Sequence, residues 1–154
     1  MKLKYLTICI IFMILAIGIS SVAAEETTVA GHRFTVPDGY IVTQKNVSQV
    51  YMGNDSDHAL LVAVPTDFKG IPEFKYQLSQ AGYDIINYEG DNFTQSGFDI
   101  NAYNFTKDSF VGVIYFAQKN DNMFMFTYAC PENEEIDLEP LNQVLESLEA
   151  WFKN

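Results

Sequence analysis

The stretch FVGVIYFAQKNDNMFMFTYA, residues 110–129, decides the fold class of this chain. Two apolar runs, Phe110 to Gln118 and Met123 to Ala129, flank the polar segment Lys119 to Asn122. Asn and Asp side chains tolerate the backbone dihedrals of tight turns. The stretch therefore predicts an antiparallel β-hairpin.

Shorter strand signals lie on both sides of the turn Pro37-Asp38-Gly39 and recur farther along the chain. The expected strands are Phe34–Val36, Tyr40–Val42, Gln49–Met52, Ala59–Val64, Tyr83–Tyr88 and Phe98–Phe105. The run from Ala59 to Val64 is apolar on both faces, which is typical of a strand inside a covered sheet. We expect residues 25–28 to be a polar lead-in and residues 89–97 to be a loop.

Two segments have helical spacing instead. Between Gly70 and Gly82, apolar residues recur every three or four positions, Pro72 fits a first helical turn, and Gly82 can end the helix. The second helix is expected to begin near Asp137, a favourable N-cap, and to continue to the end of the chain. Its apolar stripe consists of Leu138, Leu141, Val144, Leu145, Leu148, Trp151 and Phe152. A stripe of this width is expected to cover the sheet.

These segments together predict an α+β fold with a central, mostly antiparallel sheet of about six to seven strands and two helices, preceded by an N-terminal signal helix. Residues 25–154 are long enough for a single globular domain. The 12 Phe and 9 Tyr residues indicate a folded core.

The leader places the protein outside the cytoplasm. Lys2 and Lys4 precede an apolar run from Leu6 to Ile19, and Val22-Ala23-Ala24 offers small residues for cleavage. Residues 1–24 are therefore expected to be a signal peptide. The alternative is an uncleaved signal anchor, because residues 5–24 are just long enough to span a membrane as a helix. Either way, we expect an extracellular or cell-surface location, with membrane association only through this segment.

Charge narrows the classes of partner. The leader holds two of the nine basic residues and none of the 20 acidic ones, so the rest of the chain has a net charge of −13. Nucleic acid and anionic lipid surfaces would repel such a domain. Four Asn-x-Ser/Thr sequons, at Asn46, Asn54, Asn92 and Asn104, are possible glycosylation sites in an exported chain.

The sequence resembles the PsbP/Mog1 superfamily. The resemblance rests on the opening Phe34-Thr35-Val36-Pro37-Asp38-Gly39-Tyr40, the two-sided central strands, and the closing helix from Leu141 to Leu148 with Ser147 before its last leucine. The order of the expected strands and helices is also similar. The resemblance implies a non-catalytic partner of a larger assembly, because most members of this group have that role. The leader, acidity and sequons are also similar to those of small exported proteins of methanogenic archaea.

Candidates for catalysis are few. His32 and His58 lack the spacing of a zinc motif, and Cys130 is the one cysteine outside the leader, so the domain has no internal disulfide. Cys130 with either histidine could form the nucleophile and base of a small hydrolase. Burial of Cys130 as a small apolar residue is the simpler interpretation. No catalytic, cofactor-binding or metal-binding residue is assigned, and no cofactor is expected.

Three other patterns have simple structural interpretations. Asp55-Ser56-Asp57 and Glu89-Gly90-Asp91-Asn92 offer oxygen ligands for calcium but lack the spacing of an EF-hand, which favours ordinary turns. The acidic residues Glu132, Glu134, Glu135, Asp137 and Glu139 form either a solvated approach to the last helix or a docking site for a basic partner. Met123 and Met125 could bind copper with a cysteine, but core positions in a strand are favoured.

The leading hypothesis is an exported, non-enzymatic binding or accessory domain at the cell surface, whose partner is another envelope protein or a glycan. The first alternative is a small hydrolase whose nucleophile and base meet only in the folded chain. The second is a glycosylated structural protein of the cell envelope.

Overall fold

A computed structural model describes residues 25–149 of the chain. The predicted leader, together with Trp151 and Phe152 of the predicted last helix, lies outside the described residues. Within the described range, no helix is both long and apolar enough to cross a membrane.

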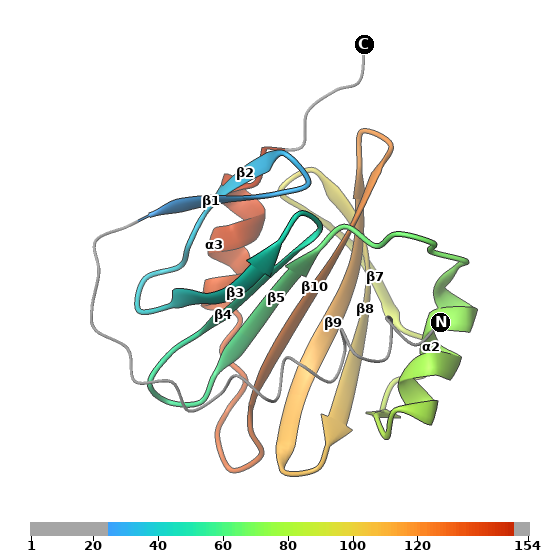
Figure 1. Cartoon of the computed structure of the whole chain (residues 1–154). Coiled ribbons are helices and arrows are strands. Elements are labelled where there is room, and N and C mark those ends of the chain that lie inside the picture. The colour runs from blue at the N-terminus through green and yellow to red at the C-terminus, as the bar shows by residue number, and fades with distance from the viewer. Residues whose placement is uncertain (1–24, 150–154) are drawn as a thin grey trace.

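Eight strands form one antiparallel sheet in the spatial order β3-β4-β5-β10-β9-β8-β6, and β7 also pairs with β8 (Figure 1). The bounds are β3 Ile41–Asn46, β4 Gln49–Gly53, β5 Ala59–Ala63, β6 Asp84–Ile85, β7 Asp91–Gln95, β8 Phe98–Lys107, β9 Phe110–Lys119 and β10 Asn122–Pro131. Strands β6 and β7 share the same edge of β8, because its other edge is taken by β9. The α+β fold and the mostly antiparallel sheet are confirmed.

The hairpin predicted from residues 110–129 is confirmed as β9 and β10. Ten residue pairs join the two strands, from Lys119 opposite Asn122 to Phe110 opposite Pro131. Asn120 and Asp121 form the turn, with φ angles of 53° and 66°. Such left-handed angles are the ones that Asn and Asp adopt with little cost.

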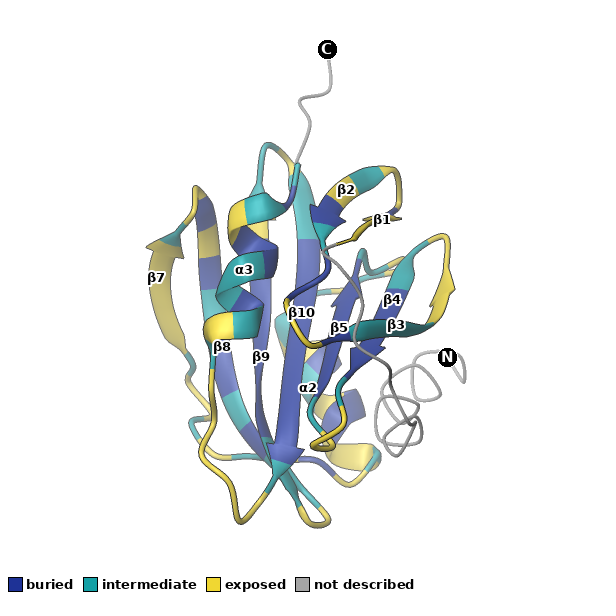
Figure 2. Cartoon of the chain, turned by 90° about the vertical axis from the view of Figure 1, so that its left-hand side faces the viewer, coloured by how far each residue is buried: buried dark blue, intermediate teal, exposed yellow. Residues whose placement is uncertain are grey.

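A helix covers each face of the sheet. Helix α3 (Glu139–Ser147) and the separate hairpin of β1 (Glu26–Val29) with β2 (His32–Thr35) lie on one face, and α2 (Ile71–Gln80) lies on the other (Figures 1 and 2). Side chains alternate between the two cores along β10, so Phe124 and Phe126 join α3 while Met125 joins α2. All five residues of β5 are buried, as expected for a strand inside a covered sheet.

Two predicted connections are strands in the structure. The polar lead-in contains β1, which pairs with β2 and buries Val29 completely. The predicted loop at 89–97 contains β7, which pairs with β8 from Gln95 opposite Phe98 to Asp91 opposite Ala102. The side chains of β7 are mostly exposed, so no apolar pattern marked it. Conversely, the strand expected over Tyr83–Tyr88 is limited to Asp84 and Ile85.

The last helix is shorter than predicted, and tertiary pairing explains where it ends. Leu148 leaves the helix in an extended conformation, and the Glu149 N–H donates to the Arg33 carbonyl oxygen at 2.8 Å. The chain therefore exchanges helical hydrogen bonds for contact with β2. At the other end, α3 begins at Glu139, and the Asp137 side chain accepts a hydrogen bond from the Glu139 N–H at 3.1 Å.

Replacement of Gly112 tests how closely β9 and β10 approach. A Cβ atom there would overlap the Tyr128 carbonyl oxygen and lie 2.6 Å from the Phe105 ring. We expect Gly112→Ala to lower the free energy of unfolding by about 2 kcal/mol or more in urea titrations, because the backbone cannot move aside. Gly53→Ala is the matched control, since its Cβ would stand 3.5 Å from the nearest atom. Equal stabilities of the two variants would contradict this packing.

Candidate functional site

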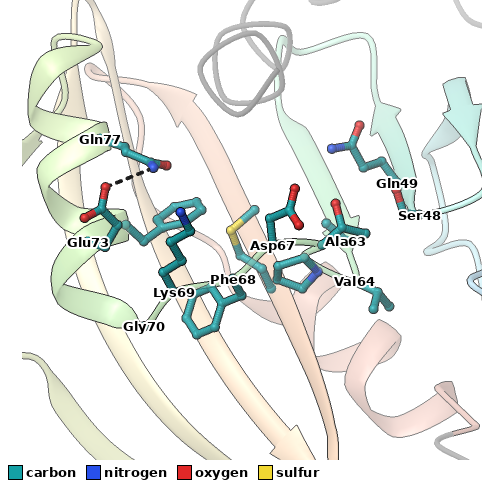
Figure 3. Close-up of a pocket in the computed structure, with 14 residues that line it drawn as sticks. Ser48, Gln49, Ala63, Val64, Asp67, Phe68, Lys69, Gly70, Glu73 and Gln77 are labelled. Carbon is teal, nitrogen blue, oxygen red and sulfur yellow. Dashed lines mark hydrogen bonds between the residues drawn. The ribbon is translucent and has the colours of Figure 1, made fainter. Parts of the chain in front are cut away.

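A cavity of about 110 Å³ lies between α2, the β5–α2 loop (residues 64–70) and neighbouring parts of β4, β5 and β10. In Figure 3, Glu73 and Gln77 reach it from α2, Asp67, Phe68 and Lys69 from the loop, and Ser48 and Gln49 from the opposite side. The cavity is therefore built from segments that are far apart in the sequence.

The loop is held against the sheet by aromatic contacts. The Phe68 ring lies 5.9 Å from that of Phe116 on β9, and the Phe74 ring on α2 lies 5.3 Å from the same ring. Asp67 has a left-handed φ of 55° and Gly70 a φ of 105°, which turn the chain into α2. The aromatic residues thus form an apolar wall whose position is fixed by the sheet.

Gln77 is the notable polar residue of this cavity. Its side chain is 2 % exposed, and its Nε2 donates to Glu73 Oε2 at 3.3 Å. Its carbonyl oxygen, Oε1, has no hydrogen-bond partner among the described residues and points away from Glu73 toward the cavity (Figure 3). A buried acceptor without a partner costs about 1–3 kcal/mol. A ligand that donates a hydrogen bond at this point would recover that cost.

The sequence carried a signal for Gln77 that was not used. In the predicted helix, the apolar positions Ile71, Phe74, Leu78 and Ala81 define one face, and Gln77 falls at the edge of that face. A polar residue in an apolar stripe needs a hydrogen-bond partner. The sequence could therefore have marked Gln77, although it could not have indicated the cavity.

A second polar cluster lies at the opposite end of β5. His58 Nε2 is 2.6 Å from Glu134 Oε1, and Tyr128 Oη is 2.8 Å from His58 Nδ1. In neutral His58, one tautomer satisfies both contacts, because Nε2–H donates to Glu134 while Nδ1 accepts from the Tyr128 hydroxyl. The order carboxylate, imidazole, hydroxyl is that of a catalytic triad.

Burial prevents Tyr128 from acting as the nucleophile of such a triad. Its side chain is 0 % exposed, and burial raises the pKa of its hydroxyl well above the ordinary value. The cluster instead connects the acidic segment 131–138 to the sheet, since the Asp137 N–H also reaches the Tyr128 hydroxyl oxygen at 3.5 Å.

The proposed hydrolase residues are not brought together. Cys130 is fully buried, burial raises the pKa of its thiol, and its Sγ lies 3.9 Å from the Glu135 carbonyl oxygen. His32 Nδ1 is 3.0 Å from the Glu149 carbonyl oxygen, and its ring packs against Phe124. Within residues 25–149, we find no hydrogen bond between the thiol and either imidazole.

The four sequons differ in accessibility. Asn46, at the end of β3, and Asn92, on the edge strand β7, are exposed. Asn54 is half-buried, and its Oδ1 accepts hydrogen bonds from the Ser56 and His58 N–H groups. Asn104 is half-buried within β8, opposite Val113. Asn46 and Asn92 are therefore more exposed than the other two sequon asparagines.

The other patterns found in the sequence have clear positions. Asp55, Ser56 and Asp57 are exposed in the turn after β4. Among residues 25–149, no group of three or more His, Cys, Asp or Glu side chains is placed to hold a metal ion. The acidic residues before α3 are exposed, and Met125 is buried in the core beneath α2, where it also lines the cavity.

Comparison with solved structures places this architecture among known folds. The chain is similar to the solution structure of cyanobacterial PsbP (CyanoP) from Synechocystis sp. PCC 6803, with a TM-score of 0.53 and 16 % sequence identity over 88 % of this chain and 95 % of that chain. This protein has a PsbP-like fold. A crystal structure from Bacteroides thetaiotaomicron VPI-5482 is also similar, with a TM-score of 0.56 and 10 % identity.

The likeness to the Bacteroides structure covers 84 % of this chain but only 49 % of the other. The chain therefore spans about half the length of that second protein. No family model matches the sequence, and no curated protein matches it either. At these identities, the likeness concerns the fold.

The buried tyrosines predict how stability responds to alkaline pH. Burial raises the pKa of both Tyr40 and Tyr128 above the ordinary value of 10.0. Below pH 10 both hydroxyls stay protonated in the folded and unfolded states. Above it, the unfolded chain loses these protons while the folded chain keeps them, so stability falls by about 1.4 kcal/mol per pH unit for each tyrosine.

Tyr128→Phe should remove one tyrosine's share of that slope, because phenylalanine does not ionise. Urea titrations between about pH 9 and pH 11 measure the slope. Tyr76→Phe is the control, because it makes the same substitution at a tyrosine that is 60 % exposed. If Tyr128→Phe keeps the full wild-type slope, Tyr128 is not protected from ionisation in the folded protein.

Proposed function

We propose that the protein is an exported, non-enzymatic binding domain that acts as an accessory subunit at the cell surface, and that the cavity beside α2 is its binding site. The observation that carries the proposal is the buried Gln77 Oε1, which faces the cavity without a hydrogen-bond partner among the described residues. Binding sites combine an apolar lining with a few placed polar groups, and this cavity has both.

The chemistry of the lining favours binding over bond breaking. The described lining contains neither histidine nor cysteine, and its aromatic wall is formed by Phe68 and Phe74. The carboxylates of Asp67 and Glu73 and the ammonium of Lys69 lie at exposed positions around it. Such groups select a ligand by charge and hydrogen bonding.

The accessory role is supported by the resemblance to the PsbP/Mog1 superfamily and by the leader. The basic residues, apolar run and small residues of segment 1–24 support the export that we propose. The exposed sequons at Asn46 and Asn92 are compatible with an extracellular location.

A substitution at Gln77 separates the binding function from stability. Gln77→Met keeps the length of the side chain and removes the unpaired acceptor, so it should raise the free energy of unfolding by about 1 kcal/mol. NMR titrations of the wild-type protein identify small fragments that shift the resonances of the Met125 methyl and the Gln77 side-chain amide. The Gln77→Met variant should no longer bind these fragments. The exposed Gln80 on the same helix provides the control, Gln80→Met.

The proposal predicts that bound fragments are recovered chemically unchanged. Fragments that bind Gln77→Met as tightly as the wild-type protein would show that the cavity is not the site. Turnover of any bound fragment would overturn the non-enzymatic assignment.

Export has its own test, because the leader determines the mass of the mature protein. Mass spectrometry of protein isolated from its native cells should give a chain that begins at Glu25. A chain that begins at Met1 and is found in the membrane fraction would support the signal-anchor alternative. Intact chain free in the cytosol would contradict export.

A further inference from the structure

We infer that the cavity beside α2 selects a primary alkylammonium group, as found at the end of a lysine side chain. The inference rests on the proposed binding function and adds the chemical class of the ligand. It depends on the orientation of the hydrogen-bonding atoms, the size of the cavity and the charges around it.

The hydrogen-bonding groups that α2 contributes to the cavity require a donor. Gln77 Oε1 accepts no hydrogen bond from the described residues, and the neighbouring Glu73 carboxylate consists only of acceptors. An ammonium group carries three donors and no acceptor, so it can bind both side chains at once. A hydroxyl offers one donor and a carboxylate none. The ammonium is therefore the best match for this pair.

The size of the cavity limits the ligand to one short chain. Its volume of about 110 Å³ is below the roughly 150 Å³ of a cavity that holds benzene. It is also far below the roughly 300–1,000 Å³ of sites for drug-sized molecules. A chain of about four carbons with a terminal nitrogen is compatible with this volume, and the Phe74 ring and Met125 offer apolar contacts to its methylene groups.

Electrostatics favour a cation at the same place. The carboxylates of Asp67 and Glu73 and the ammonium of Lys69 border the cavity, so a bound cation would lie near acidic side chains. The domain as a whole carries a charge of −13 after residue 24, so cations are attracted over a longer range. Phe68 and Phe74 also line the cavity, and aromatic rings attract cations.

An anionic ligand is the main competing choice. Lys69 and the first turn of α2, which has no side-chain cap, would attract a carboxylate at the mouth of the cavity. A carboxylate would, however, leave Gln77 Oε1 without a donor and would approach Glu73. The buried acceptor thus decides in favour of the cation.

NMR titration of the purified protein with n-butylammonium, n-butanol and n-butyrate tests the inference. We expect n-butylammonium to bind about tenfold more tightly than n-butanol, with shifts at the Gln77 side-chain amide and the Met125 methyl. Glu73→Gln, which keeps an oxygen acceptor but removes the charge, should weaken n-butylammonium about tenfold and leave n-butanol unchanged. Glu146→Gln on α3 makes the same charge change at an exposed position away from the cavity, and should have less than about a twofold effect.

The source of the amine is distinguished by a further pair of probes. If a lysine of a partner protein is the ligand, Nα-acetyl-lysine methylamide, which keeps the ε-ammonium group, should bind at least as tightly as n-butylammonium. Tighter binding of n-butylammonium would indicate a free amine. Either result supports the alkylammonium class.

The inference and the underlying function fail in different ways. If n-butanol or n-butyrate binds as tightly as n-butylammonium, and that binding is lost in Gln77→Met, the cavity is a binding site but its ligand is not a cation. Equal effects of Glu73→Gln and Glu146→Gln would also overturn the inference, because the attraction would then be a general one. If no probe shifts either reporter, the inference is wrong, and the fragment titration separately decides whether the cavity binds anything.

Discussion

The structure depends on burial of the central strands on both faces of the sheet. Strands β5, β9 and β10 place bulky side chains alternately on the two faces, so neither face of the sheet centre can remain in water. Helix α3 together with the β1–β2 hairpin covers one face, and α2 covers the other. The long crossover from β5 through α2 to β6 is needed to reach the second face, and this crossover encloses the cavity.

Sequence reasoning found the elements whose pattern is set by their own residues. The β9–β10 hairpin, the two-sided strand β5 and helix α2 all have strong periodicity, and all three were predicted close to their observed bounds. The features that were missed, strand β7 and the end of α3, are set by partners elsewhere in the chain. Strand β7 is a polar edge strand formed by pairing with β8, and α3 ends where Glu149 pairs with Arg33. The local residue pattern does not predict pairing with residues that are distant in the sequence.

The candidate site shows the same division. The two histidines and Cys130 were candidates for catalysis because of their residue types. In the structure, each of them has its own separate contacts. Residue type alone did not single out Gln77, because glutamine is common on helices. Its place in the lining of the cavity follows from burial on the sheet-facing side of α2 and from the position of the β5–α2 loop. Both are properties of the folded chain.

The contacts around Arg33 join the two ends of the described chain. Arg33 lies 3.8 Å from Glu26 and 3.2 Å from Glu149, and its carbonyl oxygen accepts the Glu149 N–H. A pulling force applied at Glu25 would therefore act on the β1–β2 hairpin before it acts on the eight-stranded sheet. Loss of the Arg33 contacts would therefore loosen both ends of the described chain together.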